Sequence, residues 1–360
     1  MKKFLSKHKY LLFVLSIPYV LILVLAIVHI DYDVTTPATI DSIENVIEVE
    51  NETNLTGSIN VVSVFSYERV SLLGYLVGST NPYAEVSKSI EYTDIDYNSL
   101  YLGGTYQKRV SLYNSVIAGY KQAGYNLNYD FYGYIVHNKT TYVDKDLNVG
   151  DMITHINGEA LSNDVNISTL INKYAGNLPT LTFTIIKNFG TSSETTADYE
   201  ITAKEFEKEG KKYFSFGFSV YPYNVPRITE GTPSFTIKFN NVNSLGPSGG
   251  LLQSFYVYEK LTGAKLSKNL KIAGTGTVDI NGNAGPIGGI GQKIFTSELS
   301  GVDIFFIPVS SPNYMNDDTE TNYIEAKKAY DSLKNPHMKI VPVWSLEEIV
   351  RYLKEYQGVE

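Results

Sequence analysis

The chain has 360 residues, of which 43% are hydrophobic and 19% charged; this is an ordinary globular composition, and the length accommodates two or three domains. Its net charge of −8 argues against a nucleic acid as the main partner, because binding phosphate backbones requires a basic surface. Cysteine is absent, which excludes a disulfide framework, cysteine-ligated zinc and a cysteine nucleophile, and the 5 histidines form no HExxH zinc pattern.

One segment near the N-terminus has the composition of a membrane span. Residues 11–30 read LLFVLSIPYVLILVLAIVHI and carry no charge as far as residue 28, which matches the roughly 20 residues that a helix needs to cross a bilayer. A cleaved signal peptide is the alternative, but its apolar core is usually only ~7–15 residues long. We therefore expect a retained anchor, with residues 1–10 in the cytoplasm and the rest of the chain outside, because lysines precede the span and aspartates follow it (Lys2, Lys3, Lys7, Lys9; Asp31, Asp33).

The next segment is acidic and rich in Thr and Asn, and we expect residues 31–56 to form a stalk. A β-rich stretch begins at Gly57. A helix is predicted over residues 106–120, where five apolar or aromatic side chains fall on one helical stripe, and Gly124 stands where a C-terminal cap is expected.

Residues 126–205 have the pattern of a separate β-rich module. Turn signals at residues 150–151 (Gly-Asp) and 157–158 (Asn-Gly) flank a short strand, a short helix is predicted over residues 165–171, and residues 181–185 alternate as a strand does.

The string at residues 147–158 resembles bacterial PDZ domains, which bind an extended peptide by adding it to the edge of a sheet. This resemblance implies a peptide-docking strand over residues 132–136, with Tyr132, Gly133 and Tyr134 at its start. A generic β module without a ligand is the alternative.

The last third of the chain indicates an α/β domain. The alternation and capping signals predict strands at residues 234–240, 270–279, 302–309 and 339–343, helices at residues 251–261 and 322–333, and a final helix opened by the capping box Ser345–Glu348.

The glycine-rich string GPSGG places Ser248 at the start of the helix predicted at residues 251–261. Free backbone N–H groups at a helix N-terminus can stabilise an oxyanion, and Gly246 and Gly249 let a substrate backbone approach closely. The string also fits the G-x-S-x-G elbow of α/β-hydrolases, which would need Asp303 and His337 as partners. Residues 240–244 favour a loop where that elbow requires a strand.

Lys293 is the better partner for this serine. It follows Ser248 by 45 residues, and a serine hydroxyl needs an adjacent base to become a nucleophile. Lysine is a base only when neutral, which burial among Ile287, Ile290 and Ile294 would favour. The alternative is an exposed helical lysine, as most lysines are.

Three strings together resemble the proteolytic domain of the Lon family. These are GPSGGL at residues 246–251, IAGTGTVDINGNAGPIGGIGQKI at residues 272–294 and GVDIFFIPV at residues 301–309. The family carries GPSAG around its serine and T-G-x-(n)-P-I-G-G-x-x-x-K around its lysine. With the anchor and the PDZ-like module, the chain is similar to membrane-anchored, PDZ-containing Lon-like serine peptidases from about residue 58 to the C-terminus.

This resemblance implies Ser248 as nucleophile, Lys293 as general base and Thr275 as a hydroxyl that bonds the lysine. Two positions depart from the family pattern: Gly249 replaces the usual alanine, which we expect to be harmless, and Leu245 stands where the ATP-dependent members have an acidic residue, which affects the oxyanion side of the site. The resemblance also implies that residues 57–125 and 206–360 form one protease domain, into which the PDZ-like module is inserted.

The sequence thus predicts an α/β (α+β) Lon-type domain with a PDZ-like module and one transmembrane helix. The expected activity is that of an ATP-independent serine endopeptidase without metal or cofactor, since the ATPase module of Lon and the G-K-[ST] ending of a P-loop are not found. Expected partners are peptides, unfolded or membrane-proximal protein segments, the membrane and, because Lon-type domains commonly form rings, other copies of the chain. An α/β-hydrolase-type esterase and a non-catalytic PDZ peptide-binding protein remain alternatives.

Overall fold

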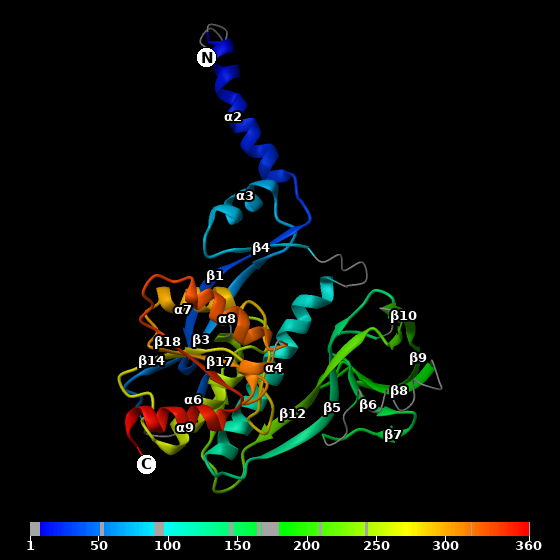
Figure 1. Cartoon of the computed structure of the whole chain (residues 1–360). Helices are drawn as coiled ribbons and strands as arrows, with labels where there is room; N and C mark the ends of the chain where they lie inside the picture. Colours follow the sequence, from blue (N-terminus) through cyan, green and yellow to red (C-terminus); the bar gives the residue numbers. More distant parts are fainter. Residues whose placement is uncertain are drawn as a thin grey trace.

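The computed structural model describes residues 8–50, 54–89, 97–143, 147–163, 167, 180–208, 211–241, 244–317 and 319–359. Helix α2 (Lys9–Ile27) projects from the folded body (Figure 1) and is long and apolar enough to cross a membrane. It ends three residues before the predicted boundary, because Val28 is extended (ψ 108°) and leads the chain towards the first strand.

The larger body is built on a mixed sheet of six strands. Their order is β18-β17-β14-β3-β1-β4, in which β18, β17, β14 and β3 run parallel and β1 pairs antiparallel with both β3 and β4. The strands are β1 (Tyr32–Ser42), β3 (Ser58–Tyr67), β4 (Glu85–Lys88), β14 (Lys271–Gly274), β17 (Ile304–Pro308) and β18 (Lys339–Val343). The predicted strands at 302–309 and 339–343 are confirmed; β17 is buried along its whole length.

The predicted stalk is wrong for most of its length, because residues 32–49 are folded. They form β1, the short 3-10 helix η1 (Ile43–Asn45) and β2 (Ile47–Val49), which pairs with β13 (Phe235–Ile237). Ile43 and Ile47 are fully buried in the core. The acidic and threonine-rich composition hid this strand, since few of its side chains face the interior.

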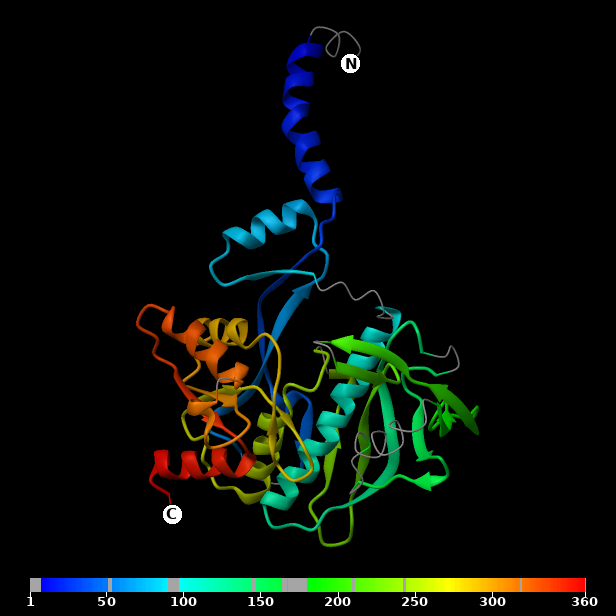
Figure 2. The same cartoon turned by 45° about the vertical axis from the view of Figure 1, so that its right-hand side comes forward.

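Helices cover both faces of this sheet (Figures 1 and 2). One face carries α6 (Gly250–Thr262), α9 (Leu346–Gln357) and, packed on α6, α4 (Tyr97–Gln122); the other carries α7 (Ile290–Leu299) and α8 (Thr321–Asp331). Helices α4, α6, α8 and α9 confirm predicted ones, with α4 starting nine residues earlier, whereas α7 was not predicted. Helix α3 (Leu72–Thr80) lies beside the end of α2. The short pair β15 (Thr277–Val278) and β16 (Ala284–Gly285) and the 3-10 helices η2 (Phe239–Asn241) and η3 (Tyr314–Asn316) complete the body.

A second sheet with its own core follows α4 in the chain and precedes α6. Its order is β12-β5-β6-β8-β9, with β7 beside β6, and a separate hairpin joins β10 to β11. The strands are β5 (Asn128–Lys139), β6 (Met152–Ile156), β7 (Glu159–Ala160), β8 (Thr180–Lys187), β9 (Thr195–Thr202), β10 (Lys204–Lys208), β11 (Lys211–Ser215) and β12 (Phe218–Arg227). The helix predicted at 165–171 falls outside the described residues, apart from Ile167.

This second sheet extends beyond the predicted boundary at residue 205, because β12 pairs with β5 along almost its whole length. Two prolines, Pro222 and Pro226, argue against a strand at the sequence level. The structure accommodates Pro222 at a register shift between it and Asn224.

The predicted docking strand at 132–136 does not offer the free edge that strand addition requires. Tyr134 pairs with Pro222 of β12 on one side and with Ile153 of β6 on the other. Gly133 is buried, and the exposed Tyr132 stacks edge-on against Phe189. A peptide therefore cannot add as a further strand at Tyr134, and this expectation is wrong.

Candidate active site

Helix α4 fixes the loop before α6 at two points. Gly246, with a positive φ of 81°, donates its N–H to Gly104 O at 3.1 Å, and Ser111 Oγ donates to Pro247 O at 2.9 Å. Ser248 thus lies at the N-terminus of α6, where the first backbone N–H groups have no intrahelical acceptor. The N–H of Gly246 already has a partner, so its predicted role at the oxyanion is not supported. Gly249 is the N-cap residue of α6, a position that suits its predicted role at the oxyanion.

Thr275 reaches this loop because the predicted strand at 270–279 is broken. β14 ends at Gly274, and Gly276 takes a φ of 142°, which is open to glycine alone among common residues. Ser248 O accepts hydrogen bonds from Gly276 N at 2.7 Å and from Thr275 Oγ1 at 3.0 Å. The break therefore connects the carboxyl end of a central strand to the serine loop.

Lys293 is a buried side chain and not a surface lysine. It lies in the first turns of α7, is 3% exposed, and packs next to the fully buried Ile290 and Ile294. Its Nζ donates to Thr275 Oγ1 at 3.0 Å. Burial, assisted by the positive charge of Lys108, lowers the pKa of Lys293 to about 8. A substantial fraction of this amine is consequently neutral at mildly alkaline pH.

A second buried lysine, Lys108 of α4, was not identified from the sequence. It is 6% exposed, and burial lowers its pKa to about 8 although the Asp41 carboxylate raises it. The sequence does carry a signal for this burial: Lys108 falls at helical spacing in a stripe of small residues on α4 (Gly104, Ser111, Ser115, Gly119). On this stripe, Ser115 Oγ donates to Gly250 O and Gly119 packs against Val257, both in α6.

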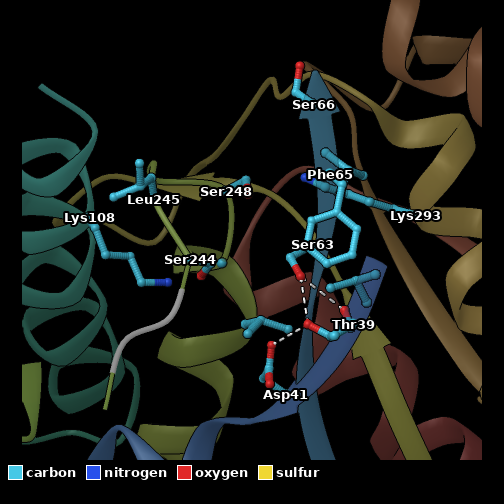
Figure 3. A pocket seen from close by; sticks show the side chains of 14 residues that line it. Thr39, Asp41, Ser63, Phe65, Ser66, Lys108, Ser244, Leu245, Ser248 and Lys293 are labelled. Carbon is cyan, nitrogen blue, oxygen red and sulfur yellow. Dashed lines mark hydrogen bonds between the residues drawn. The ribbon is translucent and has the colours of Figure 1, made fainter. Parts of the chain in front are cut away.

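Ser248, Lys293 and Lys108 line one cavity of about 630 Å³. In Figure 3, Lys108 and Lys293 enter this cavity from opposite sides. Polar side chains of β1 and β3 form its floor, where Thr39 Oγ1 donates to Asp41 Oδ2 at 2.9 Å and lies 2.9 Å from Ser63 Oγ. The complete lining is Thr39, Asp41, Val61, Val62, Ser63, Val64, Phe65, Ser66, Lys108, Ser244, Leu245, Ser248, Gly249 and Lys293.

One edge of β3 is open beside this cavity. β14 pairs with residues 58–61 of β3, whereas β1 follows the opposite edge as far as Tyr67. Beyond residue 61, no strand pairs with the cavity-facing edge of β3 within the described parts of the chain. Residues 62–66 line the cavity, so unpaired backbone groups lie next to Ser248 and Lys293.

The structure does not assemble the alternative triad. Asp303 accepts the backbone N–H of Lys271 at 2.7 Å, and the exposed His337 contacts Glu298 at 2.8 Å. Neither Asp303 nor His337 is among the described residues that line the cavity around Ser248. In the same described ranges, no three His, Cys, Asp or Glu side chains gather in one place that could hold a metal ion.

No protein-family model matches this chain, and no curated protein matches its sequence. The candidate site therefore stands on its own geometry.

Proposed function

We propose that this chain is a membrane-anchored, ATP-independent serine endopeptidase in which Ser248 is the nucleophile and Lys293 the general base. The proposal includes a Lon-type proteolytic domain, made of the larger body, and a PDZ-like module at residues 128–227. It also places residues 1–10 in the cytoplasm and the catalytic body outside the cell.

One observation carries the proposal: a buried lysine with a lowered pKa shares a cavity with a serine at a helix N-terminus, and Thr275 links the two. Thr275 Oγ1 accepts from Lys293 Nζ and donates to Ser248 O, both at 3.0 Å. A strongly shifted pKa in a cleft is typical of a catalytic group. Lys293 bonds Thr275 and not Ser248 Oγ here; catalytic hydrogen bonds often tighten only when substrate is bound.

The chemistry follows from these positions. Neutral Lys293 takes the proton of Ser248 Oγ while that oxygen attacks the scissile carbonyl, and the backbone N–H groups of Ser248 and Gly249, just before α6, stabilise the oxyanion. The C–N bond then breaks, the Lys293 ammonium donates its proton to the departing amine, and an ester on Ser248 remains. Water, deprotonated by Lys293, attacks this ester and releases the carboxylate product, and Ser248 recovers its proton.

The open edge of β3 supports an extended peptide as substrate. A peptide added along residues 62–66 would bond its backbone to β3 and pass in front of Ser248. An extended backbone requires an unfolded or flexible segment. The absence of an ATPase motif from the sequence agrees with substrates that need no unfolding.

Labelling with a fluorophosphonate, located by mass spectrometry, tests this proposal against both alternatives. We expect an adduct on Ser248 that is lost in Lys293→Met and kept in His337→Asn. Loss in His337→Asn would instead support the esterase. No adduct and no peptide cleavage by the folded protein over pH 7–10 would support a peptide-binding protein.

A further inference from the structure

Helix α3 (Leu72–Thr80, LLGYLVGST) contains no charged residue, yet it lies on the surface of the body. Leu76 is 46% exposed and Val77 61% exposed. Helical spacing puts Leu72, Leu73 and Leu76 on one face. A surface helix of a water-soluble body has the opposite arrangement, with charged or polar side chains outward.

The inward face of α3 includes Gly78 and Tyr75, whose ring lies edge-on against the ring of Tyr32 in β1. Gly78 is buried, and a Cβ on it would meet Val34 Cγ1 of β1 at 2.9 Å. Gly74 lies one turn before it on the same face. Gly78 thus brings the helix close to β1, while Leu76 and Val77 remain exposed, so their exposure is a consequence of how α3 packs.

The helix is also fixed to the end of α2. Leu72 N donates to Val28 O at 2.7 Å, and Ile30 N donates to Val70 O at 3.0 Å. Both views of the molecule have α3 lying crosswise at the base of α2, on the side of β1 and β4 that faces α2 (Figures 1 and 2). A bilayer spanned by α2 would therefore end at the level where α3 begins.

We infer that α3 lies in the interfacial layer of the bilayer, parallel to its plane, with the exposed Leu76 and Val77 against the lipid acyl chains. Interfacial helices bury such a face at the boundary between headgroups and acyl chains. The inference rests on the proposed membrane location of α2 but does not require peptidase activity.

This contact fixes the height of the catalytic cavity above the membrane. β3 leads from the cavity towards α3, and the part of it whose cavity-facing edge is unpaired, from Val62 to Tyr67, spans about 17 Å at the usual rise per residue of a strand. A peptide on this edge therefore has one end near the lipid surface. The substrates that fit this geometry are segments that leave the same membrane a few residues before the cleavage site.

A cysteine-free chain allows a direct test with single cysteines. Full-length Leu76→Cys, Val77→Cys and Val359→Cys would each carry an environment-sensitive fluorophore in phospholipid vesicles that contain a nitroxide-labelled lipid. Val359 is the matched control, because it is 45% exposed and lies near the C-terminus, at the opposite end of the body from α2. Val24→Cys, within α2, reports insertion.

We expect strong quenching by the nitroxide lipid at residues 24, 76 and 77 and little at residue 359. Quenching at 24 with no more quenching at 76 and 77 than at 359 would overturn the inference and leave the anchor intact. No quenching at residue 24 would overturn both the inference about α3 and the proposed membrane anchor α2. A label at 76 that is shielded from water but not quenched by lipid would assign the face to a second copy of the chain, and so would also overturn it.

Discussion

Lys293 Nζ donates a hydrogen bond of 3.0 Å to Thr275 Oγ1, and both side chains are buried. The same hydroxyl donates to Ser248 O, so Thr275 positions the lysine against the serine loop.

Thr275→Val keeps the shape of the side chain and removes its hydroxyl. We expect kcat to fall roughly 10-fold, because one buried hydrogen bond to the lysine is lost while the lysine remains. Thr275→Ser restores the hydroxyl and should restore most of the rate. Equal rates for the two variants in a fluorogenic peptide assay would show that the hydroxyl has no positioning role.

Lys108→Met removes the positive charge that helps to lower the pKa of Lys293. The pKa of Lys293 should then rise, so less neutral amine is present at a given pH and the pH–rate profile moves to higher pH. Below the midpoint, each unit of pKa changes the neutral fraction about tenfold. Lys121→Met is the control, since Lys121 is an exposed lysine of the same helix that contacts Asn281. Identical profiles for the Lys108 and Lys121 variants would contradict this coupling.

Burial of Lys293 also makes a stability prediction. The pKa is 10.5 in the unfolded chain and about 8 when folded, so at pH 7 both states are protonated and the buried ammonium is unfavourable by on the order of 3 kcal/mol. From pH 8 to 10.5 the folded state loses this proton first, and its stability rises. Lys293→Met should therefore unfold at a higher temperature than the parent at pH 7, and this advantage should shrink towards pH 10.5. An advantage that does not change with pH would contradict the lowered pKa.

Gly249 fits its site more tightly than the sequence indicates. A Cβ there would lie 2.8 Å from Val61 Cγ1 and 3.2 Å from Gln253 Nε2. Gly249→Ala should destabilise the fold by about 1–3 kcal/mol, as overpacking does. Adding Val61→Ala should recover part of the loss in thermal unfolding. Gly291→Ala is the control, because its Cβ would make only an ordinary contact of 3.6 Å with Ala329.

Periodicity and local motifs predicted α4, α6, α8 and α9 and the strands β17 and β18 of the larger body, but not α3 or α7. The apolar stripe of α6 and the continuous apolar run of β17 are strong local signals, and the GPSGG string marks the start of α6. These signals depend only on neighbours in the chain, so they can be read from the sequence without knowledge of the tertiary structure.

The parts that sequence reasoning missed depend on distant partners. The burial of Lys108 depends on how closely α4 approaches α6, and the open edge of β3 depends on where β14 ends. β1 was hidden by its polar composition, and Tyr134 was expected at an edge because strand order cannot be read from a single strand.

Lys293→Arg tests the proposed dyad most directly, because arginine keeps the charge and nearly the length of lysine but is always protonated in proteins. The measurement is turnover of one fluorogenic peptide by the parent and the variant from pH 6 to 10, with Ser248→Ala as the blank. We expect a parent rate that rises with pH through the lysine pKa of about 8, and a variant rate lower by roughly 10²–10⁴-fold at every pH. An arginine variant with near-parental turnover and the same pH profile would contradict Lys293 as the general base.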